Sequence, residues 1–486
     1  MAKEQQLRER VASGVAWSIG EKVGSALMQI AVSIIVANEL MPMDMGIMAI
    51  LTVFTALAQV VVDSGLSQML IRKQQPTEGD FRAVFLFNII TALALYAIFT
   101  ACSPLLARFY GWPILAKVAP VLFLIIPLNA VCVIQNTIMV REFRFASLST
   151  IIFVAALVSG IVAVAMALNG CGVWSLVGQR VSQMVVKAVL LWWTSNWRPK
   201  AKCNDSTFRE MIPYSMRLMG TDLINSLYNN ISQLFIGRIY SADALGFFNQ
   251  AQKLKDMPVT STMQSIQSVT FPALAKINDN EEKFIDSYRR VVMLTAYIIF
   301  PIMVGLISTA DDIYTLLLKP QWHPAVPYFK TLCLVGLFYP IAAVSYNILK
   351  VRSNGAIILR LEIIKKLIMT LILVATIPQS VMAIAWGLVA ASASEMILNY
   401  VASRRYASLT VWDFVRTLLP IAIVTAVMYG AIMFEAEWLA DWSVGMRLAM
   451  KILTGVVVYI SASAAMRMEA LSETITIAKQ FLSRKK

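Results

Sequence analysis

Apolar stretches long enough to cross a bilayer recur throughout this chain. A helix needs about 20 predominantly apolar residues to span the hydrocarbon core, and the 486 residues contain fourteen such windows. They lie at 13–36, 46–70, 83–103, 114–140, 147–168, 172–194, 213–237, 245–271, 288–308, 326–349, 356–376, 381–402, 414–433 and 445–466. Only 14% of the residues are charged, whereas a soluble domain carries about 25%. The sequence therefore predicts an all-α polytopic membrane protein with about fourteen transmembrane helices.

The net charge of +14 is concentrated in every second loop. Because cytoplasmic loops of membrane proteins are enriched in lysine and arginine, this alternation predicts that both termini are cytoplasmic. The pattern is a topology signal and does not indicate a nucleic-acid partner. The basic segments hold Lys3, Arg8 and Arg10, Arg72 and Lys73, Arg141 and Arg144, Arg198 and Lys200, Lys276 to Arg290, Arg352 and Arg360, Arg404 and Arg405, and Lys479 to Lys486.

Weak internal similarity divides the first twelve windows into two halves. Leu7-Arg8-Glu9 returns as Phe208-Arg209-Glu210, and the turn around Gly46 returns around Gly246. The offset is close to 200 in both cases, and six helices per half make the repeats parallel. The predicted organisation is an N-lobe at 1–194, a cytoplasmic linker at 195–212, a C-lobe at 213–402, two further spans at 403–466 and a cytoplasmic tail at 467–486.

Four windows in equivalent positions of the two halves carry polar stripes at helical spacing. Ionisable groups inside a membrane are costly and usually mark a substrate or ion pathway. The sequence thus predicts a hydrophilic cleft between the lobes. Two alternatives stay open, a self-neutralising Glu21 and Lys22 pair and a helix-end anchor at Asp63. The stripes contain Glu21 and Lys22, then Asp63, then Arg217, Asp222 and Asn229, and finally Asn249, Lys253, Asp256 and Gln264.

Several motifs resemble the Wzx-type polysaccharide flippases, especially their WzxC-like branch. They are Val62-Asp63-Ser64-Gly65-Leu66, Gly170-Cys171-Gly172-Val173-Trp174, Ala244-Leu245-Gly246-Phe247-Phe248-Asn249-Gln250, Phe271-Pro272-Ala273-Leu274 and Lys319-Pro320-Gln321-Trp322-His323-Pro324. The resemblance implies a place in the superfamily of multidrug extruders and peptidoglycan-precursor flippases. It also implies fourteen helices, two six-helix lobes and a cationic cavity for the pyrophosphate-sugar head of a polyprenyl-linked oligosaccharide. Asn38, Phe247-Phe248 and Pro320 depart from the family pattern.

The function predicted from these observations is a flippase of the bacterial inner membrane. It would move an undecaprenyl-diphosphate-linked oligosaccharide to the outer leaflet for lipopolysaccharide or exopolysaccharide synthesis, by alternating access of the lobes. Cations attract a diphosphate, and amides offer donors and acceptors to sugar hydroxyls. The predicted substrate-binding residues are Lys22, Arg180, Arg217, Lys253, Asn229, Asn249, Gln250 and Gln264, and the predicted coupling or charge-balancing residues are Glu21, Asp63, Asp222 and Asp256.

No cofactor, metal site or catalytic residue is expected, and coupling to a proton or sodium gradient is left open. Membrane lipid is an expected partner, and polysaccharide polymerase and chain-length machinery are candidate partners. The five cysteines are scattered without a C-x-x-C pair. A drug or cation antiporter remains the alternative, although such a protein would favour an acidic, aromatic cavity. A membrane glycosyltransferase or polymerase would need a larger outer loop than Thr309 to Ala325 and catalytic acids.

Overall fold

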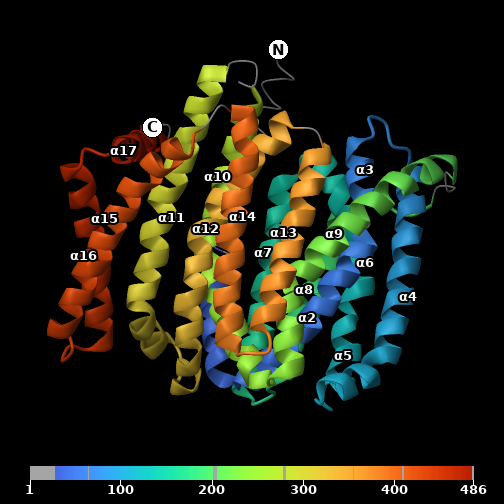
Figure 1. Cartoon of the computed structure of the whole chain (residues 1–486). Coiled ribbons are helices and arrows are strands. Elements are labelled where there is room, and N and C mark those ends of the chain that lie inside the picture. The colour runs from blue at the N-terminus through green and yellow to red at the C-terminus, as the bar shows by residue number, and fades with distance from the viewer. Residues whose placement is uncertain are drawn as a thin grey trace. The chain divides into compact units, whose positions relative to one another are not determined.

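The computed structural model describes residue 24 and residues 28–63, 65–200, 205–276, 281–353, 355–407 and 410–483 (Figure 1). Within these ranges the chain is helical and contains no strand. The helices are α2 (Pro42–Asp63), α3 (Leu66–Arg72), α4 (Glu78–Tyr110), α5 (Leu115–Phe123), α6 (Ile125–Arg141), α7 (Phe145–Leu168), α8 (Val173–Thr194), α9 (Asp205–Ile239), α10 (Ala242–Lys276), α11 (Glu281–Leu317), the 3-10 turn η1 (Pro320–Ala325), α12 (Val326–Arg352), α13 (Gly355–Thr376), α14 (Val381–Ala407), α15 (Val411–Trp438), α16 (Val444–Ala465) and α17 (Glu469–Ser483).

Nine helices in the described ranges are long and apolar enough to cross a membrane. They overlap nine of the predicted windows, which confirms the all-α membrane fold; the total of fourteen stays a prediction. Four more predicted windows coincide with α8, α9, α10 and α13, which are long but interrupted by charged residues. These four helices fall short in apolarity because charged and polar residues interrupt their apolar sequence.

The described residues form two compact units that meet between Gly246 and Phe247. Helix α9 belongs to the first unit because it packs on α2, α3 and α4. The predicted C-lobe, by contrast, begins at residue 213, so the two divisions differ in where α9 is placed. The lobe boundaries inferred from the repeat stay a prediction.

In the first unit, the opening turns of α2 and α10 cross at two glycines related by the repeat. A Cβ atom on Gly46 would lie 1.9 Å from the carbonyl oxygen of Ala242, and one on Gly246 would lie 1.9 Å from that of Pro42. The contact is reciprocal, because Ala242 and Pro42 are also separated by the offset of the repeat. Only glycine lets the two backbones approach this closely.

A side chain at Gly246 should destabilise the protein. We expect Gly246→Ala to lower the free energy of unfolding by about 1–3 kcal/mol, because its methyl group must push the Pro42 carbonyl away. Gly430→Ala in α15 is the control, since no atom lies within 4 Å of the added methyl group. Alanine lowers the conformational entropy of the unfolded chain, so this variant should be as stable as the wild type or more stable. Thermal unfolding in detergent measures both variants. Equal melting temperatures would show that the crossing tolerates a side chain.

One arginine in each unit binds backbone carbonyl groups from the end of a long helix. Arg141, at the end of α6, donates to the carbonyl oxygens of Leu70 and Lys73, with 2.8 Å to Lys73. Arg352, at the end of α12, donates to the carbonyl oxygen of Tyr406 at 2.8 Å and to the Glu281 carboxylate at 3.0 Å. In each unit an arginine at a helix end thus binds the backbone of another segment.

In the second unit, Figure 1 shows α11, α15 and α16 as long neighbouring helices, and α12 lies beside α14. Helix α17 is attached to α11 by an ion pair between Arg290 Nε and Glu473 Oε1 at 2.8 Å. Burial raises the pKa of the Glu473 carboxyl above its usual range, and the neighbouring Arg290 guanidinium opposes that shift. The two spans predicted outside the repeat and the tail helix are thus packed against the second unit.

Candidate functional site

The predicted site residues are only partly covered by the structure. Lys22 and Glu21 lie outside the described residues, and so does the side chain of Gln264. The others lie on four helices: Asp63 on α2, Arg180 on α8, Arg217, Asp222 and Asn229 on α9, and Asn249, Gln250, Lys253 and Asp256 on α10. Apart from Asp63, which ends α2, they occupy the helices rich in polar groups.

Arg180 lies on the face of α8 turned away from lipid. The exposed apolar residues Val185, Val189 and Trp193 follow one side of α8, and at 3.6 residues per turn Arg180 lies on the opposite side. Its side chain is exposed although protein surrounds it.

A second charged group of the first unit lies at the end of α2. The Asp63 carboxylate is exposed, accepts a hydrogen bond from Asn129 of α6 and faces the Lys187 ammonium of α8. By helical spacing Lys187 shares the side of α8 that carries Arg180. As the last residue of α2, Asp63 also fits the alternative of a helix-end anchor. Either way it places a carboxyl group beside the Lys187 ammonium.

Helix α9 exposes part of its polar stripe. Arg217 and Asn229 are exposed and Asp222 is half-buried. At a rise of 1.5 Å per residue, Arg217 lies ~18 Å along the helix from Asp205, and Asn229 lies ~15 Å from Ile239. Both are thus at least two helical turns from the ends of α9.

Helix α10 carries three charged residues within one turn, Lys253, Lys255 and Asp256. Lys253 is exposed and lies ~16 Å along the helix from Ala242. Asp256 pairs with Lys255 at 2.5 Å, and Lys255, which the sequence reasoning did not select, is buried. Gln250 is 1% exposed and its Oε1 has no hydrogen-bond partner among the described residues. Gln250 therefore faces packed protein, whereas Asn249 is half-buried.

Sequence reasoning missed a charged cluster on α13 and α14. Lys365 bridges the carboxylates of Glu362 and Glu395, and Lys366 follows it directly. The signal was present as Glu-x-x-Lys-Lys inside the window 356–376 and as a lone glutamate inside 381–402. The sequence alone did not single these charges out, because their spatial pairing depends on how α13 packs against α14.

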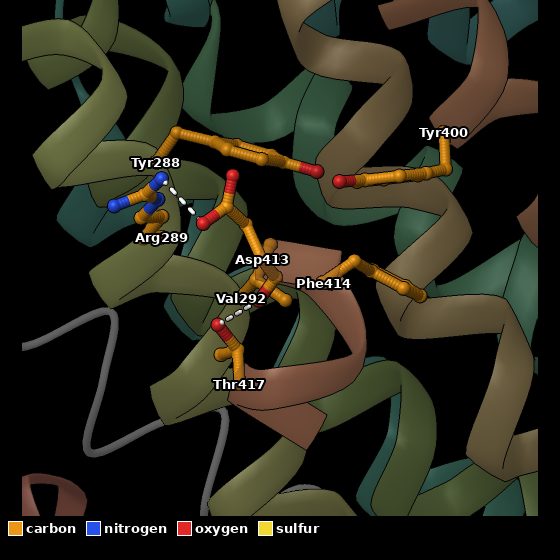
Figure 2. Close-up of a pocket in the computed structure, with 7 residues that line it drawn as sticks. All are labelled: Tyr288, Arg289, Val292, Tyr400, Asp413, Phe414 and Thr417. Atoms are coloured by element: carbon orange, nitrogen blue, oxygen red, sulfur yellow. Dashed lines mark hydrogen bonds and ion pairs between the residues drawn. The ribbon is translucent and has the colours of Figure 1, made fainter. Parts of the chain in front are cut away.

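Figure 2 shows a small cavity between α11, α14 and α15. The Arg289 guanidinium contacts Asp413 at 3.0 Å, and the Tyr288 and Tyr400 hydroxyls point toward each other. Asp413 also completes the capping box that starts α15. The backbone N–H of Thr410 donates to the Asp413 carboxylate, and the backbone N–H of Asp413 donates to the Thr410 hydroxyl. The cavity measures about 10 Å³. It is too small for a sugar diphosphate, so we interpret it as a packing defect at a helix junction.

A larger hollow of about 410 Å³ lies where α11, η1 and α12 meet. Its lining includes Asp311, His323 and Lys330, and the Lys330 ammonium contacts Asp311 at 2.6 Å. The expected outer loop from Thr309 to Ala325 is wrong in its first half, because α11 continues to Leu317. Asp312 is therefore a helical, buried residue and not part of a loop. No described His, Cys, Asp or Glu residues form a group of three that could hold a metal.

The chain is similar to known proteins of polysaccharide biosynthesis. Residues 35–327 match the family model described as "Polysaccharide biosynthesis protein". The chain is 25% identical over 337 residues to the teichuronic acid biosynthesis protein TuaB of Bacillus subtilis, covering 68% of this chain and 69% of that protein. It is 23% identical over 370 residues to the lipopolysaccharide biosynthesis protein WzxC of Escherichia coli, covering 74% and 73%.

The fold also matches a solved transporter structure. The lipid II flippase MurJ in an inward closed conformation aligns over 93% of this chain and 98% of its own, with a TM-score of 0.72 and 15% sequence identity. At that identity the likeness concerns the fold alone. It places the helices described here in a known membrane-transporter architecture.

Proposed function

The chain belongs to the family of polysaccharide biosynthesis proteins, and from that premise we propose that it flips an undecaprenyl-diphosphate-linked oligosaccharide from the inner to the outer leaflet of the bacterial cytoplasmic membrane. Both termini would lie in the cytoplasm, as the basic loops predict. The chain is an integral membrane protein of the polysaccharide biosynthesis family and has a transporter fold. Substrate, membrane and direction are the proposal.

The observation that carries the proposal is the exposure of cations within polar membrane helices. Arg180, Arg217 and Lys253 all keep exposed side chains, and a cation at the bilayer centre costs about 3 kcal/mol on insertion scales. An anionic head group would recover that cost through charge-assisted hydrogen bonds. A diphosphate supplies two adjacent negative groups of this kind.

The remaining predicted residues fit a carbohydrate head group by their chemistry. Asn229 and Asn249 carry amides, which donate and accept hydrogen bonds with sugar hydroxyls. The polyprenyl tail would stay in lipid while the head group crosses, and alternating access of the two lobes around the cationic cavity would provide the route. Asp63, Asp222 and Asp256 would balance the cations when no substrate is bound.

Removing the protein from its native cell should stop polysaccharide export without stopping precursor synthesis. We expect lipid-linked oligosaccharide to accumulate on the cytoplasmic face, inaccessible to a lectin added to intact cells and accessible after lysis. Expression of the chain from a plasmid should restore surface polysaccharide. If the intermediate never forms in the depleted cell, the protein is an enzyme of assembly. If export continues while drug or ion efflux is lost, the antiporter alternative holds.

A further inference from the structure

The strongest unassigned feature is a group of aromatic and basic side chains around the last turn of α8, within the first unit. We call it the basic patch, and it consists of Phe143, Arg144, Trp193, Arg198 and Lys200. Phe143 and Trp193 are 56% and 81% exposed, and the side chains of Arg198 and Lys200 are exposed as well. None of these residues belongs to the polar stripes, so the proposed transport path does not account for them.

Hydrogen bonds hold two guanidinium groups of the basic patch at the end of α8. Arg198 uses three of its five N–H groups on backbone carbonyl oxygens, among them those of Trp192 at 2.9 Å and Ser195 at 2.8 Å. Its guanidinium also lies 5.2 Å from the centre of the Trp192 ring. Arg144 donates to the carbonyl oxygen of Thr194 at 3.4 Å. Both cations are thus fixed at one helix end, and Arg198 keeps two N–H groups for a ligand.

Lys200 is held beside these guanidinium groups by its backbone. Its N–H donates to the carbonyl oxygen of Arg198 at 2.8 Å, and its own carbonyl oxygen accepts from Arg82 at 3.3 Å. In the part of the chain that the structure describes, the patch makes one ion pair, from Arg144 to Glu142 at 3.6 Å. It involves neither Arg198 nor Lys200, so the patch carries an excess of positive charge.

The basic patch lies where membrane helices end. Arg144 directly precedes α7, and both α7 and α4 are long and apolar enough to cross a membrane. Near the start of α4, the rings of Phe81 and Phe85 lie 6.4 and 5.7 Å from the ring of Trp197. Trp193 continues the exposed apolar side of α8 to its end. Aromatic rings beside cations at helix ends are typical of the depth of the lipid head groups.

The backbone of Phe143 adopts a conformation that favours glycine. Its φ is 55°, and a residue with a Cβ atom is strained in this left-handed region. Burial does not offset the strain, because the side chain is 56% exposed. Contact with lipid offsets it, since a ring that inserts below the head groups is removed from water. Such strained positions cluster at functional sites.

Capping of α8 explains only part of the basic patch. Cations are favoured at a helix C-terminus, because the last carbonyl groups lack partners within the helix. This accounts for the hydrogen bonds of Arg144 and Arg198. It does not account for Lys200, whose ammonium contacts no carbonyl group of the described residues, or for the exposed ring of Trp193. A ligand that is anionic at one end and apolar at the other explains both.

We propose that the basic patch binds the head group of an anionic phospholipid. The phosphate oxygens accept charge-assisted hydrogen bonds from Arg198 and Lys200, and the acyl chains pass the rings of Phe143 and Trp193. Basic pockets between membrane helices bind anionic head groups in this way. A zwitterionic head group brings its own cation, which the patch repels, so charge selects the anionic lipid. The site lies on the lipid-facing side of α8, opposite Arg180, and is independent of what the chain transports.

Native mass spectrometry of the purified, full-length protein in mild detergent counts bound lipids directly. The protein is titrated with phosphatidylglycerol or with phosphatidylcholine of the same acyl chains. We expect the wild type to bind its first phosphatidylglycerol about tenfold more tightly than phosphatidylcholine. Lys200→Gln should weaken phosphatidylglycerol binding about fivefold, the contribution of one basic residue near a membrane surface. Phosphatidylcholine binding should stay the same, and Lys200→Arg should behave as the wild type.

Lys117→Gln is the matched control, because it removes the same charge from an exposed lysine on α5, which follows the far end of α4. It should leave phosphatidylglycerol binding unchanged. Equal affinity of the wild type for the two lipids, or equal effects of Lys200→Gln and Lys117→Gln, would overturn the proposal. Lys200→Gln breaks no side-chain hydrogen bond of the described residues, so we expect it to fold normally, and circular dichroism checks this. A failed flippase assignment would leave the lipid preference intact.

Discussion

Replacing Asp312 with asparagine should lower the free energy of unfolding by about 3–5 kcal/mol, the usual effect of removing one partner from a buried ion pair. Asp312 is 1% exposed on α11. Its two carboxylate oxygens contact Arg447 Nε at 2.5 Å and Lys451 Nζ at 2.6 Å, both on α16. Lys451 is itself buried, so the variant leaves an ammonium without its counter-charge. Unfolding followed by heat or denaturant in detergent measures the loss.

The neighbouring residue provides a matched control. Asp311 makes an ion pair of similar length with Lys330, 2.6 Å, but both side chains are more than a third exposed. Asp311→Asn should therefore change stability by less than about 1 kcal/mol. Adding Lys451→Met to Asp312→Asn should recover part of the loss, because the buried charge is then gone. Equal effects at Asp311 and Asp312 would contradict the account of α16 as a helix fixed by a buried carboxylate.

Much of this fold follows from hydropathy. Length and apolarity located the helices from α2 to α16, because each lipid-facing helix must carry about 20 apolar residues. The even count per half and the offset between Gly46 and Gly246 indicated the repeat, and the reciprocal contact at these glycines agrees with it. The hydropathy signal was weakest at α8, α9, α10 and α13, where charges interrupt the apolar windows.

The ion pairs between helices could not be predicted from the sequence. Asp312 was placed in a loop because hydropathy falls near residue 309, whereas the helix itself runs on to Leu317. Its partners are 135 and 139 residues away in the chain, and no local pattern specifies them. The same holds for Lys365 and Glu395, which are 30 residues apart. Periodicity identifies the face of a helix, but only packing decides which face it meets.

Removing a cation that binds the diphosphate should slow flipping. Hydrogen bonds to charged groups contribute about 1.5–3 kcal/mol each, so Arg217→Ala and Lys253→Ala should each reduce flipping by roughly tenfold to a hundredfold. Arg180→Ala should behave in the same way if its side chain lines the same path. Arg108→Ala is the control, because this exposed arginine lies in the last turn of α4, outside the polar stripes. An equal loss at Arg108 would indicate a general effect of net charge.

Flipping in reconstituted vesicles tests the central claim most directly. Vesicles would carry a dye-labelled undecaprenyl-diphosphate trisaccharide, and an impermeant quencher added outside would report the fraction of head groups reaching the outer leaflet. We predict that quenching in protein-free vesicles stops once all the labelled lipid in the outer leaflet has been quenched. It should run close to completion with the wild-type protein and slow markedly with Arg217→Ala or Lys253→Ala. A wild-type protein no faster than empty vesicles, or cation variants as fast as the wild type, would contradict a cationic path for a diphosphate-linked sugar.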